Sequence, residues 1–392
     1  MIGGSRRVAV TGIGVVASCG VGVDAFWDGL LREPAPGARQ IEDWDATDLF
    51  GPKEIRRVDR FTQFAVAAAE QALAQAGEIG ADPDRSGVLI GTGVGGLSTL
   101  EEQIVLRHEK GPRRVSPFLV PMMMSNAAPA TISMRFGWRG PCEATVTACA
   151  ASTHAIGNAA RLIAMGICDA VITGGTEAAI TPTGVAGFSN MTALSASGMS
   201  RPYDTERDGF VIAEGGAVLV LEEWESAKAR GVRIWGEVMG SASTADAHHI
   251  TAPAPDGSGA VRCMELALAD AGVSPAAIGH INGHGTSTPL NDAAEAEAIV
   301  KVFGPDGPPV TSTKGVTGHA LGAAGALEAA AVLLAMDRGL IPPTAGLLNQ
   351  DPEIRLDVVT GEPRPWTPSA ALSNSFGFGG HNGCLVFGPP EG

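Results

Sequence analysis

Short apolar stretches that run into glycine turns alternate with alanine-rich stretches of helical periodicity along the whole chain. The apolar stretches are RRVAVTGIGVV (6–16), RSGVLIGTGVGG (85–96), CDAVITGG (168–175), GAVLVLEEW (216–224), IGHINGHG (278–285) and PPVTSTKG (308–315). Runs of this kind indicate strands that are covered on both faces. Between the first two lies DRFTQFAVAAAEQALAQAG (59–77), which has the spacing of an amphipathic helix ending at Gly77. The alternation therefore predicts a layered α/β fold.

The two halves of the chain also resemble each other. Residues 159–165 read AARLIAM and residues 330–336 read AAVLLAM, so five of the seven positions are identical. Each segment is expected on a helix that follows a strand and a loop, which indicates a duplicated unit. We therefore predict one body made of two fused halves, residues 1–237 and 238–392. The N-termini of the two repeated helices can then meet at one site.

Composition excludes several classes of protein. The formal net charge of −15 over 392 residues makes the chain a poor candidate for binding nucleic acid or a membrane surface. No stretch approaches the roughly 18 continuous apolar residues of a membrane span. The six cysteines form no CxxC pair and no zinc-type cluster with histidine. We expect free thiols, no bound metal and a cytoplasmic location.

The segment GTGVGG (91–96) follows a predicted strand and has the GxGxxG spacing of a dinucleotide-binding turn. The chain continues into LSTLEEQIVLRHEKG, and no strand with a terminal acid follows at the distance that a ribose contact requires. The GxxxxGK[ST] motif of nucleotide-binding loops is absent from the sequence. We therefore expect no nucleotide cofactor.

Cys149 lies where the β-rich run TVT (145–147) meets a helical pattern. A free cysteine is more often a small buried hydrophobe than a nucleophile. At a helix N-terminus, however, unpaired N–H groups favour the thiolate and can hold a developing oxyanion. The choice between these two interpretations depends on what else the fold brings to the same place.

Other reactive side chains stand at similar junctions between strands and helices. His284 lies in INGHGTSTPLNDAAEAEA, which also contains Glu295, and His319 lies in TSTKGVTGHALGAAGALEAA, five residues after Lys314. Small neighbours leave room for a substrate. With Cys149, these residues form a plausible nucleophilic site in which two neutral imidazoles can stabilise an enolate oxygen.

At the level of motifs, the chain resembles the β-ketoacyl-acyl-carrier-protein synthases of the thiolase superfamily, most closely the elongating type II branch. The resemblance rests on TACAAST, NGHGTSTPLND, STKGVTGHALGAAGALEA, LSNSFGFGGHNG and SRPYDTERDGFVIAEGGAVLVLEE, and it extends from Arg7 to Phe387. It implies a thiolase-like fold of two pseudo-repeated halves in a five-layered αβαβα arrangement. It also implies elongation of a fatty-acyl or polyketide chain by two carbons, through decarboxylative Claisen condensation with malonyl groups.

The same resemblance implies roles for individual residues. Cys149 would carry the acyl chain, and His284 and His319 would bind the malonyl thioester carbonyl and assist decarboxylation. Lys314 would be a charged support, paired with Glu295.

Further roles follow from the other motifs. The backbone N–H groups of Cys149 and Phe378 would form an oxyanion hole within a gating loop. The loop also contains Phe376, Gly377 and Gly379. Thr286 and Thr288 would bind a pantetheine arm, and Leu100 would line an acyl pocket.

The implied partners are an acyl carrier protein and a second subunit. Substrates would arrive on the phosphopantetheine of the carrier, with no other cofactor. Because carriers of this family are acidic, docking requires a local basic patch, for which the candidates are Lys53, Arg56, Arg57, Arg60, Arg201 and Arg207. A solvated helix face is the alternative for these residues. The second subunit would be a copy of this chain or a homologous chain-length factor.

Three alternatives stand beside an elongating fatty-acid enzyme. The same chemistry in a type II polyketide synthase, with a chain-length-factor subunit, stays open. A degradative thiolase is disfavoured because His319 stands where that class has a second cysteine. A non-catalytic chain-length subunit is disfavoured by the presence of Cys149 and both histidines. The sequence departs from the family pattern at Gly283, where alanine is usual, at His381 and in the Met122–Met124 run.

Overall fold

The computed structural model describes residues 6–390, so the outermost ends of the two predicted halves, 1–5 and 391–392, lie outside the described residues. Its main sheet has 11 strands, in the order β4-β3-β5-β6-β1-β7-β13-β12-β8-β9 with β2 beside β1. The strands of the first half are β1 (Val8–Ala17), β2 (Gly20–Val21), β3 (Ser86–Gly91), β4 (Cys142–Thr145), β5 (Ala170–Glu177) and β6 (Gly215–Glu223). Those of the second half are β7 (Gly236–Ala245), β8 (Ile278–Asn282), β9 (Val310–Thr311), β12 (Ala370–Gly377) and β13 (His381–Gly388).

Both halves have the same topology. Without the short β2, each half has five strands, which we number 1 to 5 in chain order. Their spatial order is 3-2-4-5-1 in the first half and 1-5-4-2-3, the same order reversed, in the second. The pairings also correspond, since β3 is parallel to β4 and β5 as β8 is parallel to β9 and β12. The antiparallel pairs β5–β6 and β1–β6 correspond to β12–β13 and β7–β13. The predicted duplication is therefore present in the fold.

The strands of the first half and those of the second half lie on either side of the β1–β7 junction and are called here the first and the second sheet. The junction has two residue pairs, Ala9 with Glu237 and Val10 with Gly236. The predicted division after residue 237 falls inside β7, so β7 contributes its first residues to this junction.

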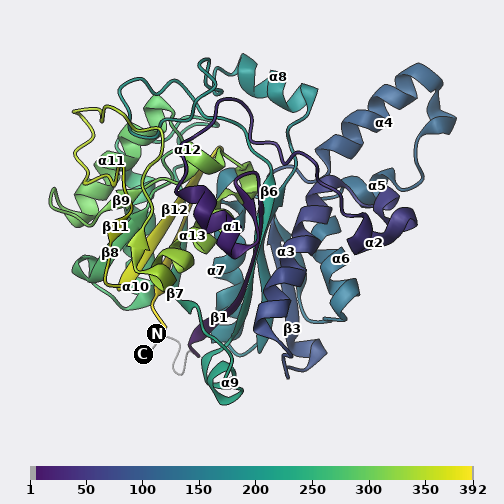
Figure 1. The fold of residues 1–392 in the computed structure, drawn as a ribbon, viewed down its shortest axis with the longest axis horizontal. Helices are drawn as coiled ribbons and strands as arrows, with labels where there is room; N and C mark the ends of the chain where they lie inside the picture. Colours follow the sequence, from purple (N-terminus) through teal and green to yellow (C-terminus); the bar gives the residue numbers. More distant parts are fainter. Residues whose placement is uncertain (1–5, 391–392) are drawn as a thin grey trace.

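Helices complete five layers (Figure 1). Helices α3 (Arg60–Ala76) and α6 (Ala127–Phe136) pack with the outer face of the first sheet. Helices α7 (Ala151–Ala164) and α13 (Ala324–Arg338) lie between the two sheets and share one core with both. Helices α10 (Ser258–Ala271) and α11 (Pro289–Phe303) cover the outer face of the second sheet. The predicted αβαβα arrangement is confirmed, and the repeated AARLIAM and AAVLLAM segments form its central layer.

Glycine allows the outer helix to pack directly on the strand backbone. A Cβ at Gly12 would lie 2.0 Å from the carbonyl oxygen of Ala72, and one at Gly14 would lie 1.8 Å from that of Ala68. Helix α3 therefore rests on β1 with no side chain between them. Such close contact explains how a chain with 53 glycines and few aromatic residues fills its core.

Shorter elements connect the layers and frame the site. They are α1 (Val23–Leu30), α2 (Thr47–Glu54), α4 (Leu97–Lys110), α5 (Leu119–Met123), α8 (Pro182–Asn190), α9 (Trp224–Ala229), α12 (Lys314–Thr317), β10 (Leu340–Ile341) and β11 (Arg364–Pro365). Six 3-10 turns are η1 (Ile55–Arg57), η2 (Pro83–Arg85), η3 (Pro112–Arg114), η4 (Ala148–Ala150), η5 (Pro275–Ala277) and η6 (Leu321–Ala323). Within residues 6–390, no helix has the length and apolar character needed to cross a bilayer. All six cysteines are free thiols.

Candidate active site

The two central helices begin in the same way, and their N-termini meet. Each is preceded by a 3-10 turn whose first residue has a positive φ, 50° at Ala148 and 45° at Leu321. Such values are uncommon outside glycine and mark a backbone held by its surroundings. The turn before α7 carries Cys149, and the loop before α13 carries His319. His319 Nε2 lies 3.0 Å from Cys149 Sγ.

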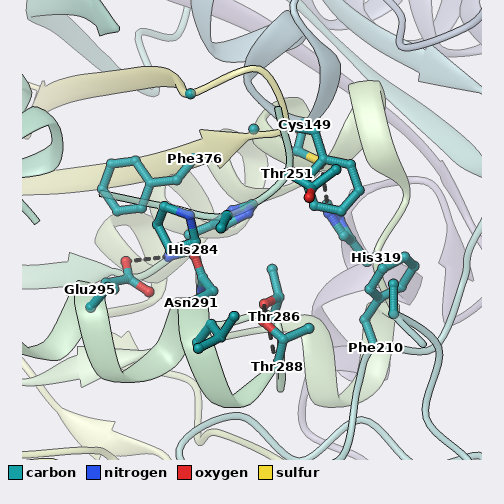
Figure 2. A pocket seen from close by; sticks show the side chains of 18 of the residues that line it. Cys149, Phe210, Thr251, His284, Thr286, Thr288, Asn291, Glu295, His319 and Phe376 are labelled. Carbon is teal, nitrogen blue, oxygen red and sulfur yellow. Dashed lines mark hydrogen bonds between the residues drawn. The ribbon is translucent and has the colours of Figure 1, made fainter. Parts of the chain in front are cut away.

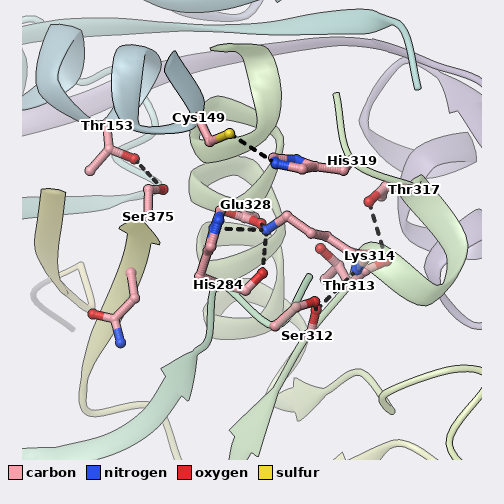
Figure 3. A network of polar contacts seen from close by, with 12 residues as sticks. Cys149, Thr153, His284, Ser312, Thr313, Lys314, Thr317, His319, Glu328 and Ser375 are labelled. Atoms are coloured by element: carbon pink, nitrogen blue, oxygen red, sulfur yellow. Dashed lines mark hydrogen bonds and ion pairs between the residues drawn. The ribbon is translucent and has the colours of Figure 1, made fainter. Parts of the chain in front are cut away.

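Lys314 orients the second imidazole. Its ammonium donates to the backbone carbonyl of His284 at 2.6 Å and lies 3.3 Å from His284 Nδ1 (Figure 3). An ammonium group has only donors, so Nδ1 must accept and the ring proton is on Nε2. The rings of His284 and His319 are edge to face, with centroids 5.4 Å apart. The site therefore places two imidazoles and a thiol side by side.

The ion-pair partner predicted for Lys314 was wrong. Lys314, which is 1% exposed, pairs with Glu328 on α13. Glu295 is already occupied, since its two carboxylate oxygens accept the backbone N–H groups of His284 at 2.6 Å and Gly285 at 2.7 Å. The sequence did carry a signal for Glu328, because it is the single charged residue of the apolar run 324–336. A buried carboxylate in such a helix requires a partner.

A second buried carboxylate, Glu177 at the end of β5, explains the GTGVGG segment. It accepts the N–H groups of Gly93 at 2.6 Å and Gly322 at 3.0 Å, and the hydroxyl of Thr92 at 3.1 Å. The glycine turn therefore presents its N–H groups to an internal carboxyl group rather than to a phosphate. Through Gly322, the same carboxylate ties this turn to the 3-10 turn that begins α13.

Burial determines the protonation states of the site. Burial lowers the pKa of both His284 and His319 well below the usual range, and the charge of Lys314 lowers each further. Both imidazoles are therefore neutral near pH 7. Burial also raises the pKa of Cys149 to about 11, although Lys314 and the backbone N–H of Phe378 act in the opposite direction. The expected thiolate at the helix N-terminus is thus a neutral thiol in the resting site, because desolvation outweighs the helix terminus.

The thiol of Cys149 and the imidazoles of His284 and His319 line one cavity of about 660 Å³ (Figure 2). Of the residues predicted for the site, those that line it are Cys149, His284, Thr286, Thr288, Glu295, His319, Phe376, Gly377 and Phe378. The hydroxyls of Thr286 and Thr288 are 2.9 Å apart on one wall. Two aromatic residues that sequence reasoning missed complete the lining. Phe188 packs on Phe210, whose ring centroid is 5.0 Å from that of His319.

Three predicted site residues lie outside the lining of this cavity. Lys314 contacts Nδ1 of His284, 3.3 Å away, and does not line the cavity itself. Gly379 donates its N–H to the carbonyl of Ile250 at 2.7 Å, which ties the loop predicted to be a gate to the 246–257 loop. Leu100 is on α4, and its place in an acyl pocket stays a prediction.

Two of the predicted docking arginines are structural. Arg60 binds the buried carboxylate of Glu214, and Arg207, with a side chain only 8% exposed, pairs with Asp351. Their guanidinium groups are committed to internal partners, so the docking assignment is withdrawn for both. Lys53, Arg56 and Arg57 are exposed on α2 and η1. Arg201 is largely covered and pairs with Glu206.

Within residues 6–390, a thiophilic cation could find three ligand atoms at one place. These atoms belong to Cys149, His284 and His319. One atom from each lies within 4.8 Å of the others. Thiolate and imidazole are typical zinc ligands, but the adjacent Lys314 ammonium opposes a cation here. A site without metal stays our prediction.

Known proteins are similar to this chain in sequence and in fold. The family described as Beta-ketoacyl synthase, N-terminal domain, matches residues 39–227, and the corresponding C-terminal domain matches residues 235–348. A 3-oxoacyl-[acyl-carrier-protein] synthase 2 from Synechocystis is 46% identical over 97% of this chain and 98% of its own length.

Solved structures agree. The ishigamide ketosynthase/chain length factor superposes with a TM-score of 0.94 at 33% identity, covering 99% of this chain and 100% of that one. A type II polyketide synthase ketosynthase, solved in complex with its acyl-carrier protein, gives a TM-score of 0.90 at 32% identity, covering 98% and 100%.

The raised pKa of Cys149 predicts how its reactivity depends on pH. Because the thiol is neutral below about pH 11, its alkylation by iodoacetamide should rise about tenfold per pH unit from pH 7 to pH 10. Peptide mass mapping measures the rate at Cys149, and Cys149→Ser shows the background. A plateau below pH 8 would mean a preformed thiolate and would contradict this assignment.

Proposed function

Because this chain belongs to the β-ketoacyl synthase family and is a condensing acyltransferase, we propose that Cys149, His284 and His319 carry its reaction in two stages. In the first stage, Cys149 Sγ attacks the thioester of an acyl group carried on phosphopantetheine. Its proton passes to His319 Nε2, 3.0 Å away, and the carrier thiolate takes that proton from His319 as it leaves, which returns the ring to its neutral form with a proton on Nδ1. The backbone N–H groups of Cys149 and Phe378 hold the tetrahedral oxyanion.

In the second stage, a malonyl thioester enters the same cavity. Loss of CO2 leaves a carbanion whose charge is delocalised onto the thioester oxygen. The Nε2–H of neutral His284 donates to that enolate oxygen, and His319, whose ring is edge to face with that of His284, donates as well once its own proton has moved from Nδ1 to Nε2. The carbanion then attacks the acyl carbonyl on Cys149, the bond between that carbonyl carbon and Sγ breaks, and the released thiolate takes up a proton from solvent. The product is longer by two carbons.

The observation that carries this proposal is the placement of two buried imidazoles side by side, one of them 3.0 Å from the Cys149 thiol. Lys314 fixes the His284 tautomer and burial keeps both rings neutral, so His284 can donate to an enolate and His319 can accept the thiol proton. We propose that Thr286 and Thr288 bind the pantetheine arm, because their hydroxyls line the same cavity. The proposed cofactor is the carrier's phosphopantetheine alone.

The two stages make a prediction that separates the histidines. His284→Ala should lower decarboxylation of malonyl-carrier by about 10²- to 10³-fold, the usual effect of removing one oxyanion donor, with little change in acylation of Cys149. His319→Ala should slow both steps, because His319 also takes the thiol proton. Released CO2 and the intact mass of acylated protein measure the two steps separately. An equal loss of both steps in His284→Ala would refute this division of roles.

A type II polyketide ketosynthase paired with a chain-length factor is the second candidate. The favouring observation is that the ishigamide ketosynthase/chain length factor superposes with a TM-score of 0.94. The chemistry at Cys149 is the same in both candidates. They differ in the second subunit and in the number of condensations.

We further propose that an acidic carrier docks on a basic face formed by Lys53, Arg56, Arg57, Arg113 and Arg114. The last two, on η3, were missed from the sequence. Arg57 lies over the ring of Phe118 at 4.4 Å, which brings η1 beside the segment that follows η3. All five charged side chains are exposed on a protein of net charge −15, so an acidic partner is attracted locally.

Charge reversal tests this docking face. The double substitution Arg56→Glu and Arg57→Glu should raise the KM for acyl-carrier about tenfold or more, while small thioester mimics react unchanged. Arg262→Glu, an exposed arginine on α10 in the opposite outer layer, is the matched control. Unchanged carrier kinetics in the double variant would refute the assignment.

The edge of the first sheet is the proposed contact with a second subunit. β4 is the last strand of the order and half of it is exposed, which leaves backbone N–H and C=O groups available for pairing. Exposed apolar side chains lie on segments near it: Val146, 50% exposed, directly follows β4, Met134, 76% exposed, is on α6 beside β4, and Val120, 56% exposed, is on α5, which contacts α6. Exposed apolar side chains beside an unpaired strand favour an interface at this edge. We propose a homodimer through this edge, or the equivalent pair with a chain-length factor.

Substitutions at this edge should change the oligomeric state. Met134→Glu combined with Val120→Glu should convert the dimer into a monomer in sedimentation experiments, because two charges would be buried without partners. Met165→Glu, at a similarly exposed methionine outside this surface, should leave the dimer intact. A wild-type chain that sediments as a monomer at micromolar concentration would contradict the proposal.

A further inference from the structure

The SRPYDTERDGF segment (200–210) packs against the loop that carries His284. The N–H of Arg201 donates to the hydroxyl of Ser287 at 2.8 Å, and the N–H of Gly209 donates to its carbonyl at 3.0 Å. Asp292 accepts the N–H groups of both Tyr203 at 2.9 Å and Ser287 at 3.2 Å. The segment is therefore fastened to the 283–288 loop at several points.

Tyr203 extends this contact to the backbone of the catalytic histidine. It is the only tyrosine of the chain and is fully buried. Its hydroxyl donates to Glu295 Oε2 at 3.3 Å, and the same carboxylate accepts the N–H groups of His284 and Gly285. One carboxylate thus connects the tyrosine ring to the position of the His284 peptide.

The hydroxyl of Tyr203 occupies the space that a side chain at position 283 would need. A Cβ at Gly283 would lie 2.2 Å from the hydroxyl oxygen of Tyr203. The next nearest atoms would be Glu295 Oε1 at 3.3 Å and Tyr203 Cζ at 3.5 Å, close to or within ordinary contact. Gly283 is not among the residues with positive φ, so its backbone accepts alanine. The hydroxyl oxygen is the main obstacle to a side chain at position 283.

We propose that Tyr203 is a positioning residue for His284 and that Gly283 is its steric complement. The hydroxyl occupies the volume of a methyl group at position 283 and bonds the carboxylate that holds His284 in place. The inference rests on the proposed role of His284 in decarboxylation. It goes beyond that role by assigning a function to two residues that touch no substrate.

Three variants test the pair. In Gly283→Ala, the methyl group should push against the hydroxyl and displace the His284 loop, lowering malonyl-carrier decarboxylation about tenfold or more. Tyr203→Phe should lower it about threefold, the effect of losing one modest hydrogen bond. In the double variant, removal of the hydroxyl makes room for the methyl group. Decarboxylation should therefore recover to within about threefold of the wild-type rate.

Acylation of Cys149 is the internal reference, because a merely structural defect would lower both steps together. It should stay within about twofold of wild type in all three variants. Gly80→Ala, where a Cβ would meet no atom within 4 Å, is the matched control and should change neither step. If Gly283→Ala does not fold, recovery of folded protein in the double variant supports the pair. The ratio of the two steps in Tyr203→Phe then decides the positioning role.

A double variant no faster than Gly283→Ala, or a Gly283→Ala protein that decarboxylates at the wild-type rate, would overturn the inference while leaving the proposed function intact. A wild-type protein that acylates Cys149 but fails to decarboxylate malonyl-carrier would remove the role of His284. The inference about Tyr203 would then fall with it.

Discussion

The buried ion pair between Lys314 and Glu328 is the interaction on which the chemistry of the site depends. An ammonium group at 1% exposure is tolerable only beside a carboxylate and other acceptors. Glu328 comes from the central helix α13, so the pair anchors the His284 loop to the core of the molecule. The remaining N–H groups of Lys314 are directed to His284, where they select the tautomer that presents Nε2–H to the cavity. Removing either charge would therefore disturb both the fold and the histidine.

The resting site carries no net charge on its three reacting groups. Burial disfavours the thiolate at Cys149 and both imidazolium ions. Charge appears only as bonds are made and broken, and it develops within reach of donors that are already in place. Donors oriented beforehand in a desolvated site are effective because they need not reorganise during the reaction. The duplicated fold provides this arrangement by bringing two helix N-termini together.

The sequence predicted those features that depend on local pattern or on repetition. The layered fold followed from alternating strands and helices, and the match between residues 159–165 and 330–336 located the central helices. Predictions that depended on long-range partners were less successful. Lys314 has two candidate carboxylates, and only the fold shows that backbone N–H groups already occupy Glu295. Arg60 was predicted to dock a carrier together with Arg56 and Arg57, yet it pairs with Glu214, 154 residues away. The thiol pKa was misjudged because sequence shows a helix terminus but not the depth of burial.

The central claim is that Cys149 carries the growing chain, and the mass of the acylated protein tests it most directly. After incubation with an acyl-carrier and no malonyl substrate, peptide mapping should find one acyl group, on the peptide that contains Cys149. The Cys149→Ala protein, folded with an unchanged melting temperature, should gain no mass and form no condensation product. An acyl group on another residue, or condensation that persists in Cys149→Ala, would contradict the account.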